Sequence, residues 1–278
     1  MRSDSQIAHF RFYEELNVFL PPRCRKVEFD YSFSGRPSLK DAIESLGVPH
    51  PEVDLILVNG LSVGFEQRLQ DGDRVSVYPV FEALDISGVT RLRPAPLRNP
   101  RFILDVHLGR LARLLRLAGF DTLYSNDQAD LAIIDTAAVE GRIILTRDIG
   151  LLKHGQVSRG YWIRHQKPAA QLAEVIEKFD LSSKLQPFTR CLECNFPVET
   201  VSKEEVLDAL PPRVRERQEF FIRCPGCGRI YWPGTHYQSM RERLAGVAGL
   251  RPGDSSSPAG NDGLSPADAG MHPGGEFP

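Results

Sequence analysis

The sequence of 278 residues lacks several features that would place it in a specialised class. No apolar run approaches the roughly eighteen residues that a membrane span needs, so we expect no membrane-spanning segment. The first residues show no charged-then-apolar secretory pattern, and we therefore expect a cytoplasmic protein. Lysine and arginine number 34 against 36 acidic residues, which excludes a polybasic protein that holds nucleic acid by bulk charge. This balance does not exclude a local basic surface.

Cysteine is scarce, and its five copies are unevenly spaced. Cys24 stands alone, whereas the other four form two C-x-x-C pairs. An odd count and short paired spacing favour a metal site over disulfides, and the βαβ context of a redox dithiol is missing. Because each pair forms a turn that directs two thiolates to one tetrahedral ion, we predict a structural zinc site. Its ligands are Cys191, Cys194, Cys224 and Cys227.

The chain is long enough for several domains, and its composition divides it into five segments. The predicted limits are an α+β domain over 7–90, a proline-rich linker over 91–100, an α/β domain over 101–186, a zinc ribbon over 187–245 and a disordered tail over 246–278. The first segment is expected to contain strands near 9–13, 27–31, 54–60 and 74–79, with a helix that begins after Ser38. This ββαββ order predicts a β-grasp, ubiquitin-like domain.

The strands at 54–60 and 74–79 resemble those of the sulfur-carrier subfamily of ubiquitin-like proteins. That subfamily ends in a free Gly-Gly carboxylate, but here the last strand continues into Val80-Phe81-Glu82. We therefore expect this domain to bind a protein partner or to act as a scaffold, and not to carry sulfur.

Strands alternate with helices in the segment 101–186, and this pattern predicts a parallel sheet covered on both faces. Asp105 and Asp148 follow predicted strands, and Asp130 opens a predicted helix on the same side. Three carboxylates at one sheet edge favour a bound Mg²⁺ or Mn²⁺, because these ions prefer oxygen ligands. Each Asp taken alone is also a common helix N-cap, so only the trio is informative.

A helix is expected after Asp105, with Leu108, Leu111 and Leu115 on its buried side and three arginines on the other. The first two of these arginines are Arg110 and Arg113. Arg116 is the third arginine of the helix. In the cysteine segment, Tyr231 and Trp232 either stack on bases or form the ribbon's own small core.

The strings Asp105–Arg116 and Gly119–Thr122, and Ile144–Asp148 with Leu151–Lys153, resemble the Mut-seven-C RNase family. The segments around Cys191 and Cys224 resemble the zinc ribbon that closes this family, so the resemblance covers about residues 100 to 245. It implies a PIN-like nuclease fold and metal-assisted hydrolysis of RNA phosphodiester bonds. The family's acids fall on Asp105, Asp130 and Asp148, with Asp127 as a possible fourth. The resemblance also implies contacts to RNA phosphates, for which the candidates are Arg110, Arg113, Arg147 and Lys153, although each is also a plausible solvated charge.

The sequence therefore predicts a multidomain protein with a β-grasp domain, a PIN-like parallel-sheet domain and a small zinc ribbon. The expected function is that of a metal-dependent ribonuclease in which the zinc ribbon assists RNA binding. An adaptor that binds RNA or the ribosome without cleavage is the alternative, and catalysis in Mg²⁺ or Mn²⁺ would separate the two.

Overall fold

The computed structural model describes residues 5–80, 88–92, 99–233 and 246. Most of the predicted linker and nearly all of the predicted tail lie outside these residues. The chain divides into two compact units. The first takes in the chain up to His107 together with Asp127–Ile163, and the second takes in Leu108–Asn126 together with the chain from Arg164. No helix in the described parts of the chain is long and apolar enough to cross a membrane.

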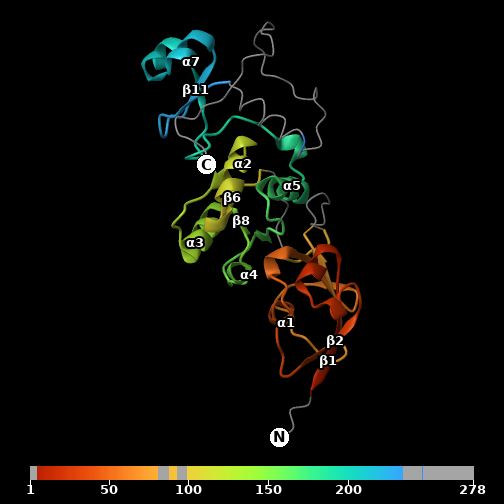
Figure 1. Cartoon of the computed structure of the whole chain (residues 1–278). Helices are drawn as coiled ribbons and strands as arrows, with labels where there is room; N and C mark the ends of the chain where they lie inside the picture. The colour runs from red at the N-terminus through yellow and green to blue at the C-terminus, as the bar shows by residue number, and fades with distance from the viewer. Residues whose placement is uncertain (1–4, 81–87, 93–98, 234–245, 247–278) are drawn as a thin grey trace. The chain divides into compact units, whose positions relative to one another are not determined.

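A five-stranded mixed sheet and one helix form the N-terminal part of the first unit (Figure 1, red to orange). The order of the strands is β2-β1-β5-β3-β4, with β1 parallel to β5 and the other pairs antiparallel. The elements are β1 (Gln6–Phe12), β2 (Phe29–Phe33), α1 (Leu39–Ser45), β3 (Val53–Val58), β4 (Leu61–Val63) and β5 (Arg74–Pro79). The prediction of a ubiquitin-like domain is confirmed. The short strand β4 is an addition to the predicted elements.

Local signals in the sequence account for this domain. Along β1, the alternate residues Ala8, Phe10 and Phe12 are buried in its core. Helix α1 begins with a capping box, in which Ser38 and Asp41 each bond the other's backbone N–H. The turn at Asn59 has a positive φ of 51°, a conformation that asparagine tolerates well.

Parallel strands of a second sheet form the other part of the first unit. The strands run in the order β6 (Phe102–Leu104), β8 (Ile143–Thr146) and β9 (Gly160–Trp162). Two helices pack against these strands, α3 (Asp130–Glu140) and α4 (Ile149–Leu152). Every residue of β8 is buried, as expected of a central strand in a parallel sheet.

The second unit contains two packed helices, α2 (Gly109–Leu117) and α5 (Pro168–Lys178), and the two-residue strand β7 (Thr122–Leu123). Leu108, Leu111 and Leu115 are buried, which confirms the predicted apolar side of the α2 segment. The cysteine segment adds an antiparallel sheet of β10 (Glu199–Val201), β11 (Phe221–Arg223) and β12 (Ile230–Tyr231), with α6 (Lys203–Val206) and α7 (Pro212–Arg217).

Candidate active site and metal centre

Asp105 lies at the carboxyl end of β6, and it is only 3% exposed. Its Oδ1 atom accepts a hydrogen bond from the His107 N–H at 2.8 Å. Its Oδ2 atom accepts one from the Arg147 N–H at 2.9 Å and another from the Thr146 hydroxyl. A carboxylate offers about four lone-pair positions, so these three bonds leave room for one further donor or a cation.

The hydroxyl of Thr146 connects Asp105 to Asp148. This hydroxyl donates to Asp105 Oδ2 and accepts a hydrogen bond from the Asp148 N–H at 2.8 Å. Thr146 is fully buried at the end of β8, so the two acids are held in a fixed relation at the ends of neighbouring strands. Sequence reasoning assigned no role to Thr146. Its position between a predicted strand and Asp148 was the feature of the sequence that could have indicated a role for it.

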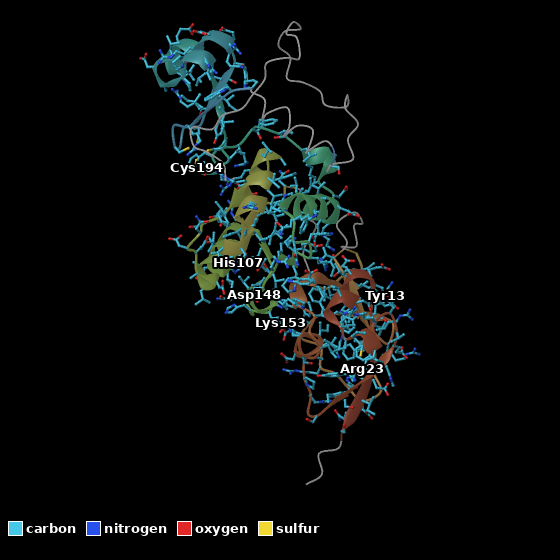
Figure 2. The ribbon with its side chains drawn as sticks, viewed as in Figure 1. Tyr13, Arg23, His107, Asp148, Lys153 and Cys194 are labelled. Carbon is cyan, nitrogen blue, oxygen red and sulfur yellow. The ribbon has the colours of Figure 1, made fainter. Side chains whose placement is uncertain are left out.

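The other two predicted acids are exposed at the starts of helices. Asp148 (labelled in Figure 2) is the N-cap of α4, and its Oδ1 accepts a hydrogen bond from the Gly150 N–H at 2.7 Å. Asp130 is the first residue of α3, whereas the N-cap is Ala129 and makes no side-chain bond. Asp148 therefore acts as a helix cap, whereas Asp130 does not.

The three aspartates do not form a ready-made ligand cluster. Among the described residues, the group of potential metal ligands with atoms gathered around one point is the cysteine quartet. Asp127 is exposed, like Asp130. The structure thus links Asp105 to Asp148 by hydrogen bonds, whereas an Mg²⁺ or Mn²⁺ site that also includes Asp130 stays a prediction.

The four predicted zinc ligands come together. The sulfur atoms of Cys191, Cys194, Cys224 and Cys227 all lie within 4.8 Å of one another. Cys191 and Cys227 are 3.6 Å apart at sulfur, and Cys194 and Cys224 are 3.3 Å apart. Four sulfurs bound tetrahedrally at about 2.3 Å from zinc would be separated by similar distances. The donor set therefore fits a structural zinc ion and leaves no position open for substrate.

The two cysteine turns have the same backbone design. In each turn, the first cysteine's N–H bonds the carbonyl five residues later, at 2.8 Å for Cys191 and 2.9 Å for Cys224. The residue after the second cysteine is left-handed, with φ of 66° at Asn195 and 72° at Gly228. This shared geometry turns both thiols of each pair toward one point.

The thiols differ in their acidity. Burial raises the pKa of Cys194 to about 12 and also raises the pKa of Cys227. Burial acts in the same direction on Cys191, but hydrogen bonds to its sulfur, first among them that of Tyr231, leave its pKa lowered. Because zinc binds thiolates, the cation itself must supply the remaining stabilisation of four negative sulfurs.

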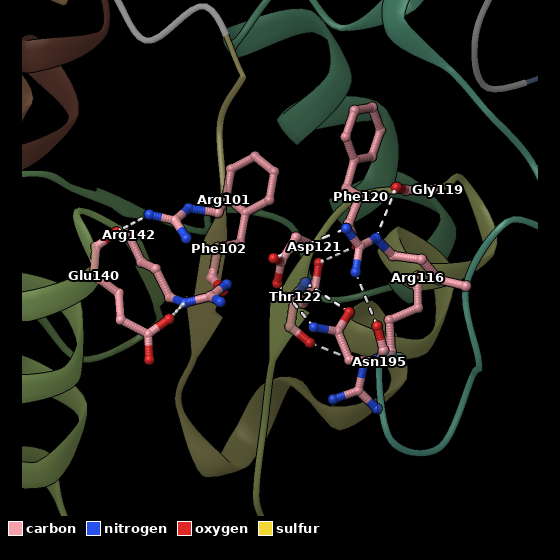
Figure 3. A network of polar contacts seen from close by, with 11 residues as sticks. Arg101, Phe102, Arg116, Gly119, Phe120, Asp121, Thr122, Glu140, Arg142 and Asn195 are labelled. Atoms are coloured by element: carbon pink, nitrogen blue, oxygen red, sulfur yellow. Dashed lines mark hydrogen bonds and ion pairs between the residues drawn. The ribbon is translucent and has the colours of Figure 1, made fainter. Parts of the chain in front are cut away.

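Polar contacts of α2 and the β7 strand hold the first cysteine turn in place (Figure 3). Arg116 donates to the carbonyls of Thr122 (2.9 Å), Leu192 (3.0 Å) and Glu193 (2.7 Å). The side chain of Asn195 accepts from the Thr122 N–H at 2.9 Å and donates to Asp121 at 2.8 Å. Asparagine therefore serves this left-handed position better than glycine would, because its amide joins the turn to β7.

The arginines of α2 are not equivalent, and the prediction that all three lie opposite the buried leucines is wrong for Arg116. Arg116 is 4% exposed, and burial lowers the pKa of its guanidinium. Arg113 forms an ion pair with Glu193, next to Cys194. Arg110 is exposed. The helical pattern of the sequence did not predict the burial of Arg116, because the carbonyls that accept its hydrogen bonds come from outside the helix.

The two remaining basic candidates lie close to Asp148. Arg147 is partly buried, with its N–H bonded to Asp105 and its carbonyl bonded to the indole of Trp162 at 3.1 Å. Lys153 (labelled in Figure 2) donates from Nζ to the Glu44 carbonyl of the β-grasp domain at 2.7 Å. Its ammonium therefore has a protein partner.

The aromatic residues of the cysteine segment are buried. Tyr231 is 2% exposed and Trp232 is 6% exposed. Trp232 belongs to a small core with Val206 and Phe221, and the Tyr231 hydroxyl lies 3.1 Å from Cys191 sulfur. These positions favour the ribbon's own core over base stacking. Cys24 packs against the β-grasp core, apart from the four ligands.

A ubiquitin-like domain, a parallel α/β sheet with acids at its strand ends and a four-cysteine centre define a class of multidomain nuclease-like protein. Comparison with family models identifies the family. Residues 100–244 match the Mut7-C RNAse domain, and residues 5–85 match the Mut7-C ubiquitin domain. The chain therefore belongs to the Mut7-C RNAse family. Searches of curated proteins and of solved structures gave no significant match.

Proposed function

We propose that this chain is a divalent-metal-dependent ribonuclease and that Asp105, Asp130 and Asp148 hold Mg²⁺ or Mn²⁺. Membership of the Mut7-C RNAse family supports the reaction class. The observation that carries the choice of residues is the hydrogen-bond chain from Asp105 through Thr146 to Asp148. This hydrogen-bond chain supports the choice because both aspartates follow neighbouring parallel strands, and ligands of α/β sheets bind beyond the carboxyl ends of the strands.

The donor chemistry fits such an ion, because all three ligands are carboxylates. When bound, the ion would polarise the phosphodiester and increase the acidity of a water molecule. Asp105 is buried and fixes the loop that carries Asp148, whereas Asp148 and Asp130 present exposed carboxylates. We assign Asp105 the anchoring position and the other two the positions closer to solvent.

Contacts to the RNA substrate are proposed for basic residues. Arg110 is exposed, and Arg147 lies next to Asp148 in the chain. Arg113 and Lys153 would have to give up Glu193 and the Glu44 carbonyl before they could bind a phosphate. We therefore assign phosphate binding first to Arg110 and Arg147, and structural contacts first to the other two.

We further propose that the zinc ribbon has a structural role and assists RNA binding from its outer surface. The domain limits 7–90, 101–186 and 187–245 are part of this proposal. None of the five cysteines, all of which the structure describes, forms a disulfide, and we propose the cytoplasm because it is the compartment that keeps cysteines reduced. The ubiquitin-like domain suggests a protein partner as well.

A matched pair of variants on α3 tests the catalytic assignment. Asp130 and Asp135 are both exposed, and only Asp130 is assigned to the site. With a defined RNA and Mn²⁺, we expect Asp130→Asn and Asp148→Asn to lower the cleavage rate at least tenfold. Asp135→Asn should cleave at the wild-type rate. Asparagine at 148 retains an oxygen for the Gly150 N–H, so the α4 cap is preserved.

The same assay separates the enzyme from the adaptor alternative. A wild-type protein that binds RNA but leaves it intact in Mn²⁺ and in Mg²⁺ would establish the adaptor. Cleavage that is equal in Asp130→Asn, Asp148→Asn and Asp135→Asn would remove the aspartates from the mechanism.

A further inference from the structure

We infer that the β-grasp domain positions the catalytic loop, with Glu52 acting on Asp148 through Trp162. This inference rests on the proposed nuclease function, because it gives Asp148 a catalytic role. In this inference the ubiquitin-like domain acts on another part of the same chain, the loop that carries Asp148. Glu52 and Trp162 are positioning residues in this scheme, since neither contacts the reacting atoms.

The first contact is between a buried carboxylate and the edge of the parallel sheet. Glu52 is 1% exposed, and its Oε1 accepts a hydrogen bond from the Trp162 N–H at 2.6 Å. The next N–H along the strand, that of Ile163, bonds the Thr146 carbonyl of β8 at 2.8 Å. Glu52 therefore takes the N–H of β9 that points away from β8. A buried carboxylate is costly unless it has such a partner.

The second contact runs from the Trp162 side chain to the loop. The indole ring lies 5.4 Å, centroid to centroid, from the Phe19 ring of the β-grasp domain. Its Nε1–H donates to the Arg147 carbonyl at 3.1 Å. The peptide between Arg147 and Asp148 is thus bonded at both ends, because the Asp148 N–H donates to Thr146. Since this peptide is planar and precedes the Asp148 Cα atom directly, its orientation restricts the backbone position from which the carboxylate extends.

Two more contacts tie the segment that follows Asp148 to the same domain. Lys153, at the C-terminal end of α4, donates to the Glu44 carbonyl. His50 Nε2 bonds the Val157 carbonyl at 2.7 Å. The β-grasp domain therefore contacts Trp162, which bonds the chain just before Asp148. It also contacts directly the end of the helix that Asp148 caps and the segment beyond that helix.

Amide hydrogen exchange on the full-length protein tests this inference without reference to cleavage. Trp162→Phe removes the indole donor but keeps an aromatic ring against Phe19, and Glu52→Ala removes the acceptor for the Trp162 N–H of β9. Each variant should exchange about three- to tenfold faster at residues 148–150 than wild type, the effect of losing one hydrogen bond. Residues 221–223 of the zinc ribbon should be unchanged. Glu52→Gln retains a carbonyl acceptor and should stay close to wild type.

Glu66→Ala is the matched control, because Glu66 is an exposed acid of the same domain. Unchanged exchange at 148–150 in Trp162→Phe would overturn the inference. Faster exchange spread evenly over β6, β8 and β9 would also overturn it, because the contacts would then serve domain packing alone. If Glu52→Ala fails to fold, Trp162→Phe carries the test.

Cleavage kinetics give the functional readout. In Mn²⁺, Trp162→Phe should lower kcat about three- to tenfold and should raise the KM for RNA by a smaller factor, because the indole bonds the carbonyl of Arg147, a proposed phosphate contact. Equal kcat values for Trp162→Phe and wild type would refute the positioning role. A wild-type protein that does not cleave would instead refute the proposed nuclease function, whereas the exchange result would still decide whether Glu52 and Trp162 hold the loop.

Discussion

The burial of Arg116 shows how a single charged residue can connect distant parts of a chain. Its guanidinium reaches three backbone carbonyls, two of them in the first cysteine turn. The planar, branched guanidinium can donate in several directions at once, which a lysine ammonium on its flexible stem cannot reproduce at the same positions. Arg116 therefore stabilises the attachment of the zinc centre to α2.

Replacement of Arg116 by lysine should destabilise this attachment. We expect Arg116→Lys to lower the apparent free energy of unfolding by about 2–4 kcal/mol, because buried carbonyls lose charged hydrogen-bond donors. Urea unfolding followed by circular dichroism measures the change. Arg110→Lys, at an exposed site on the same helix, should change stability by less than about 0.5 kcal/mol. Equal effects of the two substitutions would contradict the structural role of Arg116.

Sequence reasoning located the acidic residues better than it described their environment. The ends of β6 and β8 were predicted from short apolar runs, so the neighbourhood of Asp105 and Asp148 followed from strand order. The role of Thr146 and the partner of Lys153 did not follow. The Lys153 contact joins residues 109 positions apart, and no local pattern encodes such a contact.

Helices and strands with strong local signals were predicted well. The predicted strand at 74–79 agrees with β5, and the helix predicted to begin after Ser38 agrees with α1. Short elements such as β4, α4 and α7 were missed, because three to six residues show too little periodicity to be recognised. Their formation depends on tertiary packing.

The capping box of α1 provides a test at the level of one helix. Hydrogen bonding by Ser38 lowers the pKa of Asp41 below its ordinary value of 3.8. The unfolded chain therefore binds the proton first on acidification. The stabilisation is complete above pH 3.8 and is lost as the pH falls through the folded-state pKa.

Ser38→Ala should accordingly raise the pKa of Asp41 toward 3.8 and cost about 1 kcal/mol of stability at neutral pH. NMR titration of the Asp41 carboxyl and urea unfolding measure the two effects. Ser34→Ala, at an exposed position before the helix, is the control. An Asp41 pKa that is the same in wild type and Ser38→Ala would show that the capping box does not set it.

At the scale of the whole molecule, the cysteine centre joins two turns whose sulfurs lie 30 and 36 positions apart in the sequence. The small core around Phe221 contains few side chains, and small domains of this kind depend on a metal for stability. The ion would therefore stabilise the fold of the entire cysteine segment.

Native mass spectrometry should find one zinc ion per chain. Removal of the ion by a chelator should lower the melting temperature and make all four thiols react with a thiol reagent. Cys194→Ser should reproduce the effect, whereas Cys24→Ser should retain the zinc, because Cys24 packs in the β-grasp domain. Four thiols that react fully in the untreated, folded protein would contradict the zinc assignment.

The bond between Glu52 and β9 also bears on solubility. Strand β9 is at the edge of its sheet, and an uncovered edge offers free N–H groups to the strands of other molecules. Glu52 occupies the outward N–H of Trp162, and Phe19 lies against the indole ring. The ubiquitin-like domain therefore covers part of this edge. We expect the nuclease segment, when it is cut free of this domain, to self-associate through strand β9.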